Sequence, residues 1–258
     1  MRSNLTIDDL TIDCANVERA RDFYADLLGW KKTTAFGALA VKTDRGMTIL
    51  FWEPDIPLVS PVWPEEPGMQ QKQMHLDFTV ENVLSAVEKA IRLGATKVAM
   101  QYGGDSFVTM FDTEGHPFCL YSRTSETVFK EHFESKYFSL LADYSINIDC
   151  PDTSALRTFY AEVTGWGQEF HPTSLIVPDG MNMHFMQSDF EYIPPVWPEE
   201  PGEQQKQMHF NFQVDDLPST VDEAIRLGAT KATEQYGGDH FVALLDPVGH
   251  SFCLCRRG

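Results

Sequence analysis

The sequence predicts an α+β fold built from four modules of the order strand, helix, strand, strand, strand (βαβββ), arranged as two tandem domains. The first observation is a long internal repeat: residues 70–80 read QQKQMHLDFTV, and residues 204–214, 204 − 70 = 134 positions later, read QQKQMHFNFQV. The second is that an alternating strand pattern, a helical stripe and a glycine recur in this order along the chain. A repeat of this length is a whole domain rather than one unit of a solenoid.

The repeat divides the 258 residues into two domains of ordinary size. We expect the first domain at 1–123 and the second at 141–258, because residues 124–140 form a charged amphipathic segment that predicts a linker helix. We also expect modules 1 and 2 to pair within the first domain and modules 3 and 4 within the second. The proline-rich loops 53–73 and 188–206 are long enough to swing one sheet against the next, and exchange of modules between chains is the alternative.

Module 1 illustrates how each element is justified. Residues 9–14 alternate polar and apolar side chains, as in a strand with one packed face. Residues 17–28 place their apolar side chains on one helical stripe, and Gly29 follows as a stop signal. Runs of strand-forming residues separated by turn signals then predict three short strands, at 30–34, 38–42 and 47–52.

The other modules repeat this plan. The elements expected in module 2 are a strand at 74–80, a helix at 83–93 and strands at 97–101, 107–111 and 118–122. Those expected in the second half are a strand at 145–150, a helix at 154–164 before Gly165, strands within 174–187, and module 4 over 207–256.

Composition limits the partners of the protein. The formal net charge of −18 repels nucleic-acid phosphates and anionic lipid surfaces, so we expect neither as a partner. No signal-peptide pattern or membrane-length apolar run is present in the sequence, which favours a cytoplasmic location. The five cysteines are odd in number and lie in apolar segments, as reduced buried thiols do. We expect a monomer or homodimer that binds a small molecule.

Alternation in the first strands of modules 2 and 4 separates a core face from a polar face. On the polar faces, and on lids formed by the tryptophans of the preceding loops, we expect these ligand-binding side chains: His75, Asp77, Thr79, Cys119, Tyr121 and Trp63 in the first half, and His209, Asn211, Gln213, Cys253 and Trp197 in the second. The simpler alternatives are histidines hydrogen-bonded within the sheet, cysteines acting as small core residues, and tryptophans that anchor loops. His116 and His250 follow turn glycines, and we expect them to be exposed.

Three stretches resemble a known superfamily. They are FYADLLGW at 23–30, MHLDFTVEN at 74–82 and FDTEGHPFCLYSR at 111–123. Together with the module order, they are similar to the glyoxalase, bleomycin-resistance and dioxygenase group, the vicinal-oxygen-chelate superfamily. The resemblance implies two tandem glyoxalase-like domains, each a curved mixed sheet that forms a cup with its helices outside. It also implies a divalent metal held by histidine and glutamate in the enzymes of the group.

The resemblance to the metal-binding enzymes is incomplete. His75 and His209 match a histidine ligand of the group, but Cys119 and Cys253 stand where a last-strand glutamate is expected. Because a catalytic metal usually needs three protein ligands, we expect no catalytic metal and no other cofactor. If a divalent metal is bound, the resemblance and the residue types point to His75 with Cys119 and Asp9 as its ligands.

Three functions follow from these observations. The first is binding of a small organic molecule in a sheet cup by a glyoxalase- or bleomycin-resistance-like protein without a catalytic metal. The second is a divalent-metal-dependent lyase, isomerase or dioxygenase of the vicinal-oxygen-chelate superfamily, and the third is a non-catalytic interaction module. The sequence assigns no catalytic residue and leaves open whether the protein is an enzyme.

Overall fold

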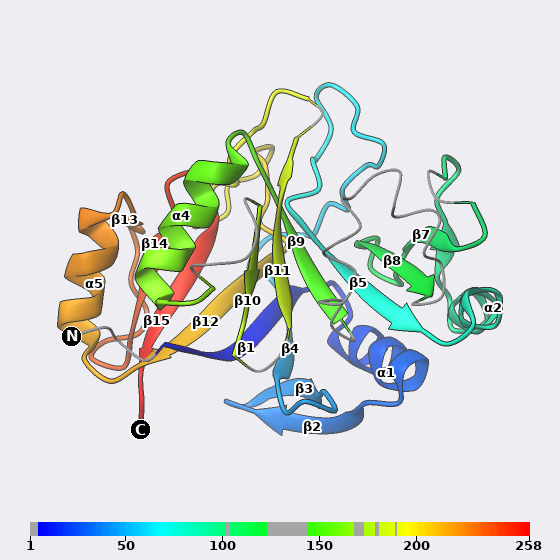
Figure 1. Cartoon of the computed structure of the whole chain (residues 1–258), viewed down its shortest axis with the longest axis horizontal. Coiled ribbons are helices and arrows are strands. Elements are labelled where there is room, and N and C mark those ends of the chain that lie inside the picture. The colour runs from blue at the N-terminus through cyan, green and yellow to red at the C-terminus, as the bar shows by residue number, and fades with distance from the viewer. Residues whose placement is uncertain (1–4, 102–103, 123–143, 168–172, 179–180, 189) are drawn as a thin grey trace.

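The computed structural model describes residues 5–101, 104–122, 144–167, 173–178, 181–188 and 190–258. These residues form the predicted α+β fold, with two curved open sheets and four helices (Figure 1). The helices are α1 (Val17–Leu28), α2 (Val83–Arg92), α4 (Thr153–Thr164) and α5 (Leu217–Arg226). None of these helices is long and apolar enough to cross a bilayer.

The strands form one sheet of eight and one of seven. In spatial order, the eight-stranded sheet contains β13 (Thr230–Lys231), β14 (Phe241–Leu245), β15 (Ser251–Arg256), β12 (Met208–Val214), β1 (Thr6–Asp13), β4 (Thr48–Trp52), β3 (Ala38–Lys42) and β2 (Lys31–Ala35). The seven-stranded sheet contains β10 (Ser174–Ile176), β11 (Asn182–Gln187), β9 (Tyr144–Cys150), β5 (Met74–Val80), β8 (Pro117–Ser122), β7 (Phe107–Phe111) and β6 (Thr96–Lys97).

The sheets pair modules differently from our expectation. The first strand of module 1, β1, lies antiparallel to the first strand of module 4, β12, and β5 of module 2 lies antiparallel to β9 of module 3. The predicted pairing of modules 1 with 2 and 3 with 4 is therefore wrong. The proline-rich loop between β4 and β5 carries the chain from one sheet to the other, so neighbours in sequence belong to different sheets.

Local signals place the helices as the sequence predicts. The side chains of Asn16 and Asp152 accept hydrogen bonds from backbone N–H groups three residues later, which caps the first turns of α1 and α4. Gly29 and Gly165 end the same helices with φ values of 76° and 77°, a left-handed conformation that glycine adopts without strain.

Two differences concern strands. The strand expected at 97–101 is only the two-residue β6, because the Gln101 side chain accepts a hydrogen bond from Thr109 N–H and donates to Thr109 O at the position of a longer strand. After α4 the described residues contain two strands rather than three, β10 and β11. The predicted linker helix at 124–140 lies outside the described residues.

One hydrophobic core serves both sheets. Tyr24 on α1 contacts Phe51 of the eight-stranded sheet and Phe78 of the seven-stranded sheet, with ring centroids 5.8 and 6.1 Å away. Tyr160 on α4 similarly contacts Phe185 and Phe212, one from each sheet. Helices α1 and α4 thus lie where the two sheets face each other (Figure 1), and their side chains belong to one continuous buried cluster.

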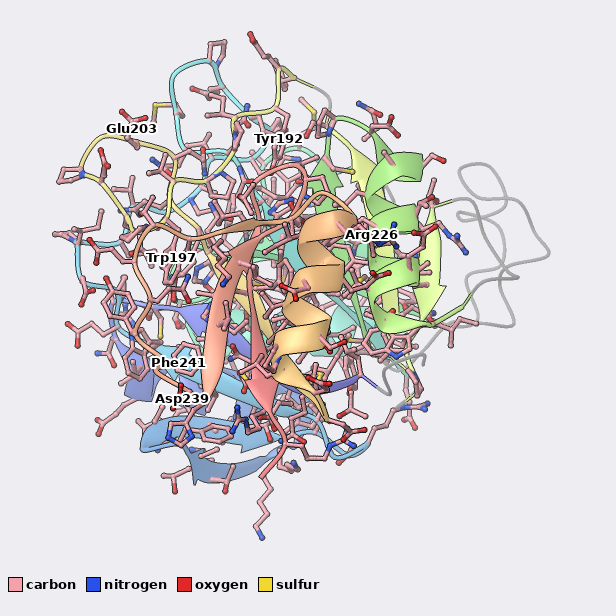
Figure 2. All side chains as sticks on the ribbon, turned by 90° about the vertical axis from the view of Figure 1, so that its left-hand side faces the viewer. Tyr192, Trp197, Glu203, Arg226, Asp239 and Phe241 are labelled. Atoms are coloured by element: carbon pink, nitrogen blue, oxygen red, sulfur yellow. The ribbon has the colours of Figure 1, made fainter. Side chains whose placement is uncertain are left out.

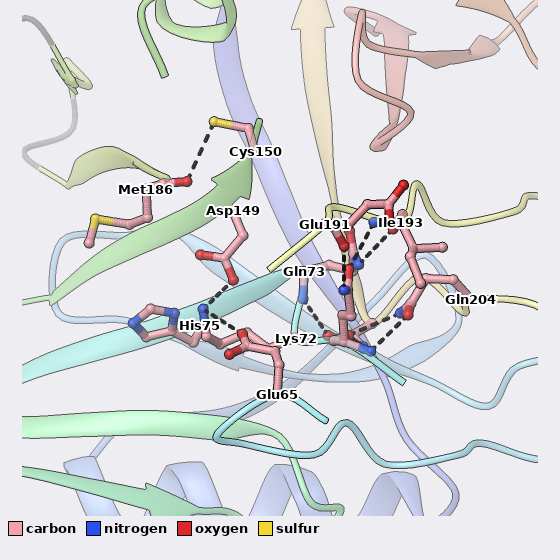
Figure 3. Close-up of polar contacts among 12 residues, drawn as sticks. Glu65, Lys72, Gln73, His75, Asp149, Cys150, Met186, Glu191, Ile193 and Gln204 are labelled. Atoms are coloured by element: carbon pink, nitrogen blue, oxygen red, sulfur yellow. Dashed lines mark hydrogen bonds and ion pairs between the residues drawn. The ribbon is translucent and has the colours of Figure 1, made fainter. Parts of the chain in front are cut away.

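The repeated QQKQ segments, residues 70–73 and 204–207, bind each other, and we call them the glutamine clasp. The backbone N–H groups of Gln71 and Gln205 donate to the side-chain oxygens of Gln204 and Gln70, both at 2.7 Å. The Gln73 N–H donates to Gln207 Oε1 at 3.0 Å. Part of the clasp is drawn in Figure 3. This identically repeated segment therefore joins the two sheets, which explains part of its repetition without any role in ligand binding.

Candidate functional site

Each sheet presents one face to the helices and the opposite face to a cup. In β5, Met74, Leu76 and Phe78 belong to the shared core, so His75 and Asp77 point away from it, as the alternation predicts. We call the face of the seven-stranded sheet that carries His75 cup B. We call the corresponding face of the eight-stranded sheet, which carries Asp9 and His209, cup A.

Cup B contains two rows of polar side chains that run across the strands. In the first row, register partners on successive strands are His75, Asn147, His184 and Ser174. In the second row they are Thr109, Cys119, Asp77, Ser145 and Asn182. The two rows come from both halves of the chain, because β5 of module 2 lies beside β9 of module 3.

His75, Asp77 and Cys119 form the centre of cup B. One ligand atom from each of the three lies within 4.8 Å of the others. His75 Nε2 is 3.5 Å from Asp77 Oδ1, and Cys119 Sγ is 3.6 Å from Thr109 Oγ1. Within the described residues, three buried polar atoms of this region form no hydrogen bond, namely His75 Nδ1, Asp77 Oδ1 and Asn147 Nδ2. Such unpaired buried atoms are rare in folded proteins and call for an explanation.

Burial sets the protonation states in cup B. It lowers the pKa of His75 well below its usual value, and the positive charge of Lys72 acts in the same direction, so the imidazole is neutral at pH 7. Burial raises the pKa of Asp77 to about 6, although the Asn147 amide and the charge of Lys72 oppose this rise. Burial also raises the pKa of the Cys119 thiol. At neutral pH cup B therefore holds a neutral histidine, a thiol and a predominantly ionised carboxylate.

At the rim of cup B, charged side chains pair with one another beside Trp63. Lys72 Nζ forms an ion pair with Asp149, lies 3.7 Å from Glu65 Oε1 and lies 4.6 Å from the centre of the Trp63 ring. The Trp63 ring is in turn 5.3 Å from the His75 ring, between centroids. Figure 3 shows Lys72 directed at its two carboxylates. The positive charge of Lys72 is therefore already balanced at the rim.

Cup A differs because its central polar groups bind one another. Asn211 Nδ2 donates to Asp9 Oδ1 at 2.7 Å, and Thr11 Oγ1 donates to the same oxygen at 3.0 Å. Burial raises the pKa of Asp9 to about 6. The described residues of this sheet also include buried polar atoms without a hydrogen bond: Asp13 Oδ1 on β1, His209 Nδ1 on β12 and Ser251 Oγ on β15. The sulfur of Cys253 lies beside this centre in the register.

The flanks of cup A are apolar. Beside the polar centre, two small clusters cover the cup face: Ala38, Ala40 and Leu50 on one side, and Ala232, Ala243 and Cys253 on the other. Trp197 and Phe241 pack against the second cluster. Figure 2 shows both aromatic side chains on the side of β14 and β15 that is opposite α5. The two cups have therefore diverged: cup B carries two polar rows across its strands, whereas cup A is polar only along its centre.

The remaining predicted residues lie toward the ends of the strands. Thr79 is half-buried and pairs in register with Tyr121, whose ring stacks on Phe107 at 6.2 Å. Gln213 pairs with Thr6 at the end of β12. These positions share a cup face with His75 or His209 but lie one step or more along the strand.

The structure corrects the conditional metal site. Asp9 is on β1 of the eight-stranded sheet, whereas His75 and Cys119 are on the seven-stranded sheet. The carboxylate beside them is Asp77, two residues from His75 on the same strand. The error follows from the wrong module pairing, which placed modules 1 and 2 in one cup.

The predicted site lacked two residues of cup B. Separately, two histidines that were expected to be exposed are buried. Asn147 and His184 were left out of the candidate site because module 3 was expected to pair with module 4. The alternation of residues 145–149 already put Asn147 on a polar face, so knowledge of the module pairing would have found it. His116 and His250 are not exposed turn residues, since they are 0% and 1% exposed. His116 Nδ1 lies 3.3 Å from Asp112 Oδ2.

The central trio of cup B is compatible with a bound zinc ion. An imidazole nitrogen, a carboxylate oxygen and a thiolate are all zinc ligands, and three protein ligands leave a fourth position for water or substrate. The unpaired His75 Nδ1 and Asp77 Oδ1 fit this use. Metal binding would have to displace the proton of Cys119, whose thiol burial keeps protonated.

Comparison with known proteins supports the fold. A family model described as a glyoxalase-like domain matches the chain twice, at residues 9–121 and 145–255. Glyoxalase I from Zea mays has a similar structure, with a TM-score of 0.60 and 13% sequence identity over 98% of this chain and 93% of its own. The cppA protein from Streptococcus pneumoniae TIGR4 has a TM-score of 0.55 and 13% identity over 99% of this chain and 100% of its own. No curated protein matches the sequence significantly.

Proposed function

Because the chain belongs to the family of glyoxalase-like domains, with the vicinal-oxygen-chelate fold, we propose that it binds a small organic molecule in cup B. The observation that carries this proposal is the set of three unpaired buried atoms, His75 Nδ1, Asp77 Oδ1 and Asn147 Nδ2. They come from two strands that are hydrogen-bonded neighbours and face the same side of the sheet.

These atoms favour a bound ligand because leaving them without hydrogen bonds destabilises the folded protein. A buried polar atom without a hydrogen bond destabilises the folded protein by about 1–3 kcal/mol. Three such atoms in one cup would lower the stability of the folded protein considerably. Neighbouring groups relieve this cost only in part: His75 Nε2 lies 3.5 Å from Asp77 Oδ1, and the Asn147 amide and the Cys119 thiol lower the pKa of Asp77. A ligand that supplies complementary donors and acceptors would remove this cost on binding.

Matched histidine variants test this proposal. In a thermal-shift screen of small organic molecules, we expect compounds that stabilise the wild-type protein to lose their effect in His75→Ala. The same compounds should keep their effect in His209→Ala, which removes the equivalent side chain, 134 residues later, from cup A. Compounds that lose their effect in His209→Ala but keep it in His75→Ala would place binding in cup A and contradict the proposal.

A second candidate function is divalent-metal chemistry, which the close approach of His75, Asp77 and Cys119 favours. These three residues would hold the ion, and a bound zinc would polarise a substrate oxygen or lower the pKa of a bound water. His184 faces the same cup one strand beyond Asn147, and its charge influences the pKa of His75. It would therefore lie beside a substrate at this ion.

Metal analysis distinguishes the two functions. If the protein binds its ligand without a metal, protein purified without chelator should contain less than about one tenth of an equivalent of zinc. A true zinc site would stay occupied through purification, because such sites bind tightly. The metal-dependent candidate predicts a stoichiometric ion that is lost in Cys119→Ser and retained in Cys253→Ser, the matched change in cup A. A stoichiometric ion lost only in Cys119→Ser would overturn the metal-free proposal.

We also infer a cytoplasmic protein that acts on a small molecule rather than on nucleic acid. Its five cysteines are all free thiols, which suits a reducing compartment. The net charge of −18 opposes binding to phosphate backbones. Light scattering coupled to size-exclusion chromatography would separate the two expected states, monomer and homodimer.

A further inference from the structure

The tryptophan of the second proline-rich loop is part of the packing of cup A. The octet PVWPEEPG occurs twice, at residues 61–68 and 195–202, with Trp63 and Trp197 in equivalent positions. Trp197 packs against the apolar cluster that flanks cup A along β14 and β15. Its ring also meets that of Tyr236, with centroids 6.2 Å apart. The indole of Trp197 therefore covers side chains of its own half of the chain.

The equivalent tryptophan of cup B, Trp63, lies elsewhere on its sheet. Its ring is 5.3 Å from the His75 ring, with an angle of 56° between the two planes. Lys72 Nζ lies 4.6 Å from the centre of the indole, a cation–π distance. Lys72 is held in turn by Asp149 of β9 and by Glu65 of the loop. These contacts fix the half-buried indole beside His75.

The position of Trp63 makes it a neighbour of any ligand bound at His75. His75 and Asn147 are register partners on adjacent strands, so both lie within about 5 Å across the sheet. A molecule whose polar head reaches these two side chains therefore also lies against the indole. An aromatic ring gains from such a neighbour beyond the area that it buries, whereas an aliphatic ring of the same size gains only the area.

We propose that Trp63 is the specificity-determining residue of cup B and that it selects ligands with a flat aromatic ring beside their polar head. This inference rests on the proposed function of cup B and names the ligand class. The ring of the ligand packs on the indole of Trp63, while its head reaches His75 and Asn147. Cup A lacks this arrangement among its described ring contacts, since Trp197 meets Tyr236 rather than His209.

Two pairs of compounds test the ligand class: benzamide with cyclohexanecarboxamide, and 2-naphthamide with decahydro-2-naphthamide. Each pair keeps the amide head and exchanges an aromatic ring system for a saturated one. By calorimetric titration of the full-length protein in buffer with EDTA, we expect the aromatic member of each pair to bind about three- to tenfold more tightly, as an added aromatic contact predicts.

Matched variants assign this preference to one tryptophan. In Trp63→Leu the two members of a pair should differ in affinity by less than about twofold, because the aromatic partner is lost. In Trp197→Leu, the same change in the equivalent octet, the preference should remain as in the wild type. Benzamide should also change the tryptophan emission of the wild type and of Trp197→Phe, but not that of Trp63→Phe. The emission measurement keeps the test valid if Trp63→Leu does not fold.

Several outcomes would overturn the inference. Equal binding of both members of each pair, lost in His75→Ala, would reject the ligand class and leave the proposed function standing. A preference that survives in Trp63→Leu would show that Trp63 only anchors its loop. Absence of binding by all four compounds would also reject the class, while the wider screen with His75→Ala and His209→Ala decides the proposed function separately.

Discussion

At the scale of single residues, the two cups show how a duplicated sheet of similar strand order changes its chemistry through a few side chains. Leu50 in β4 and His184 in β11 occupy equivalent positions, each beside the first strand of its module. Their neighbours in the next strand are Ala40 and Ser174. The residues at these two positions therefore make this flank apolar in cup A and polar in cup B.

Phe78 and His75 test the division of β5 into a core face and a cup face. Phe78 contacts the rings of Tyr24, Trp30 and Phe118, so Phe78→Ala should lower the free energy of unfolding by about 3–5 kcal/mol by opening a cavity. His75→Ala should lower it by less than about 1 kcal/mol, because His75 Nδ1 has no hydrogen bond to lose. Urea unfolding of both variants measures the difference, and equal losses would contradict the assignment of faces.

Asp9 gives the protein a predictable pH dependence. Its pKa rises from 3.8 to about 6 on folding because the carboxyl is buried, so between these values the folded protein binds a proton that the unfolded chain lacks. The contribution of Asp9 to stability is present below about pH 4 and is lost as pH rises to about 6. Above pH 6 the ionised group costs on the order of 3 kcal/mol.

Asp9→Asn should therefore stabilise the protein at pH 7.5 relative to wild type and lose this advantage near pH 4.5. The asparagine oxygen can still accept the hydrogen bond from Asn211. Urea midpoints at the two pH values measure the effect, with exposed Asp44→Asn as the control. An advantage of the same size at both pH values would show that ionisation of Asp9 is not its cause.

At the scale of secondary-structure elements, the glutamine clasp is the main polar contact between loops of the two halves. The Gln71 side chain accepts from Ile193 N–H at 2.8 Å and donates to Glu191 O at 2.7 Å. Gln205, its equivalent, accepts from Val59 N–H and donates to Pro57 O. The same side chain thus holds the opposite loop twice, once from each repeat.

Gln71→Ala and Gln205→Ala should be destabilising by similar amounts, about 2–4 kcal/mol each, because each leaves a backbone donor and a backbone acceptor unpaired. Met69→Ala, at an exposed position of the same loop, should have little effect. Thermal and urea unfolding measure all three. A loss in only one of the two glutamine variants would contradict the symmetry of the clasp.

The sequence predicts local structure well and long-range pairing poorly. Alternation, the helical stripes and the stops at Gly29 and Gly165 are local signals, and the strands and helices that they predict are largely present. Which module lies beside which is decided by contacts between residues far apart in the sequence, such as His75 with Asn147 (147 − 75 = 72 positions) in one sheet and Thr11 with His209 (209 − 11 = 198 positions) in the other. No local pattern records them. Asn147 was missed and Asp9 was placed in the wrong cup for this reason.

At the scale of the whole molecule, neither half is expected to be an independent folding unit, although the duplication defines two sequence domains. Each sheet takes one module from each half, and α1 and α4 fill one core between the sheets. The fragment 1–123 would expose the pairing edge of β1, which normally binds β12, and that of β5, which normally binds β9. Exposed edges of this kind promote association.

Expression of residues 1–123 alone should therefore give an aggregate or an exchanged dimer. Co-expression with residues 141–258 should restore a soluble complex that unfolds cooperatively, because the second fragment supplies β9 and β12. Circular dichroism and light scattering report both properties. A soluble monomer of 1–123 with a cooperative thermal transition would contradict the shared-core architecture.

The central claim is that the polar face of the seven-stranded sheet binds the ligand, and histidine-selective NMR tests it most directly. During titration with the most stabilising compound of the thermal-shift screen, the ring resonances of His75 and His184 should shift together and saturate. Those of His209 and of buried His116 and His250 should stay unchanged. Saturable shifts of His209 with unchanged His75 would contradict the claim, because they would place the ligand in the eight-stranded sheet.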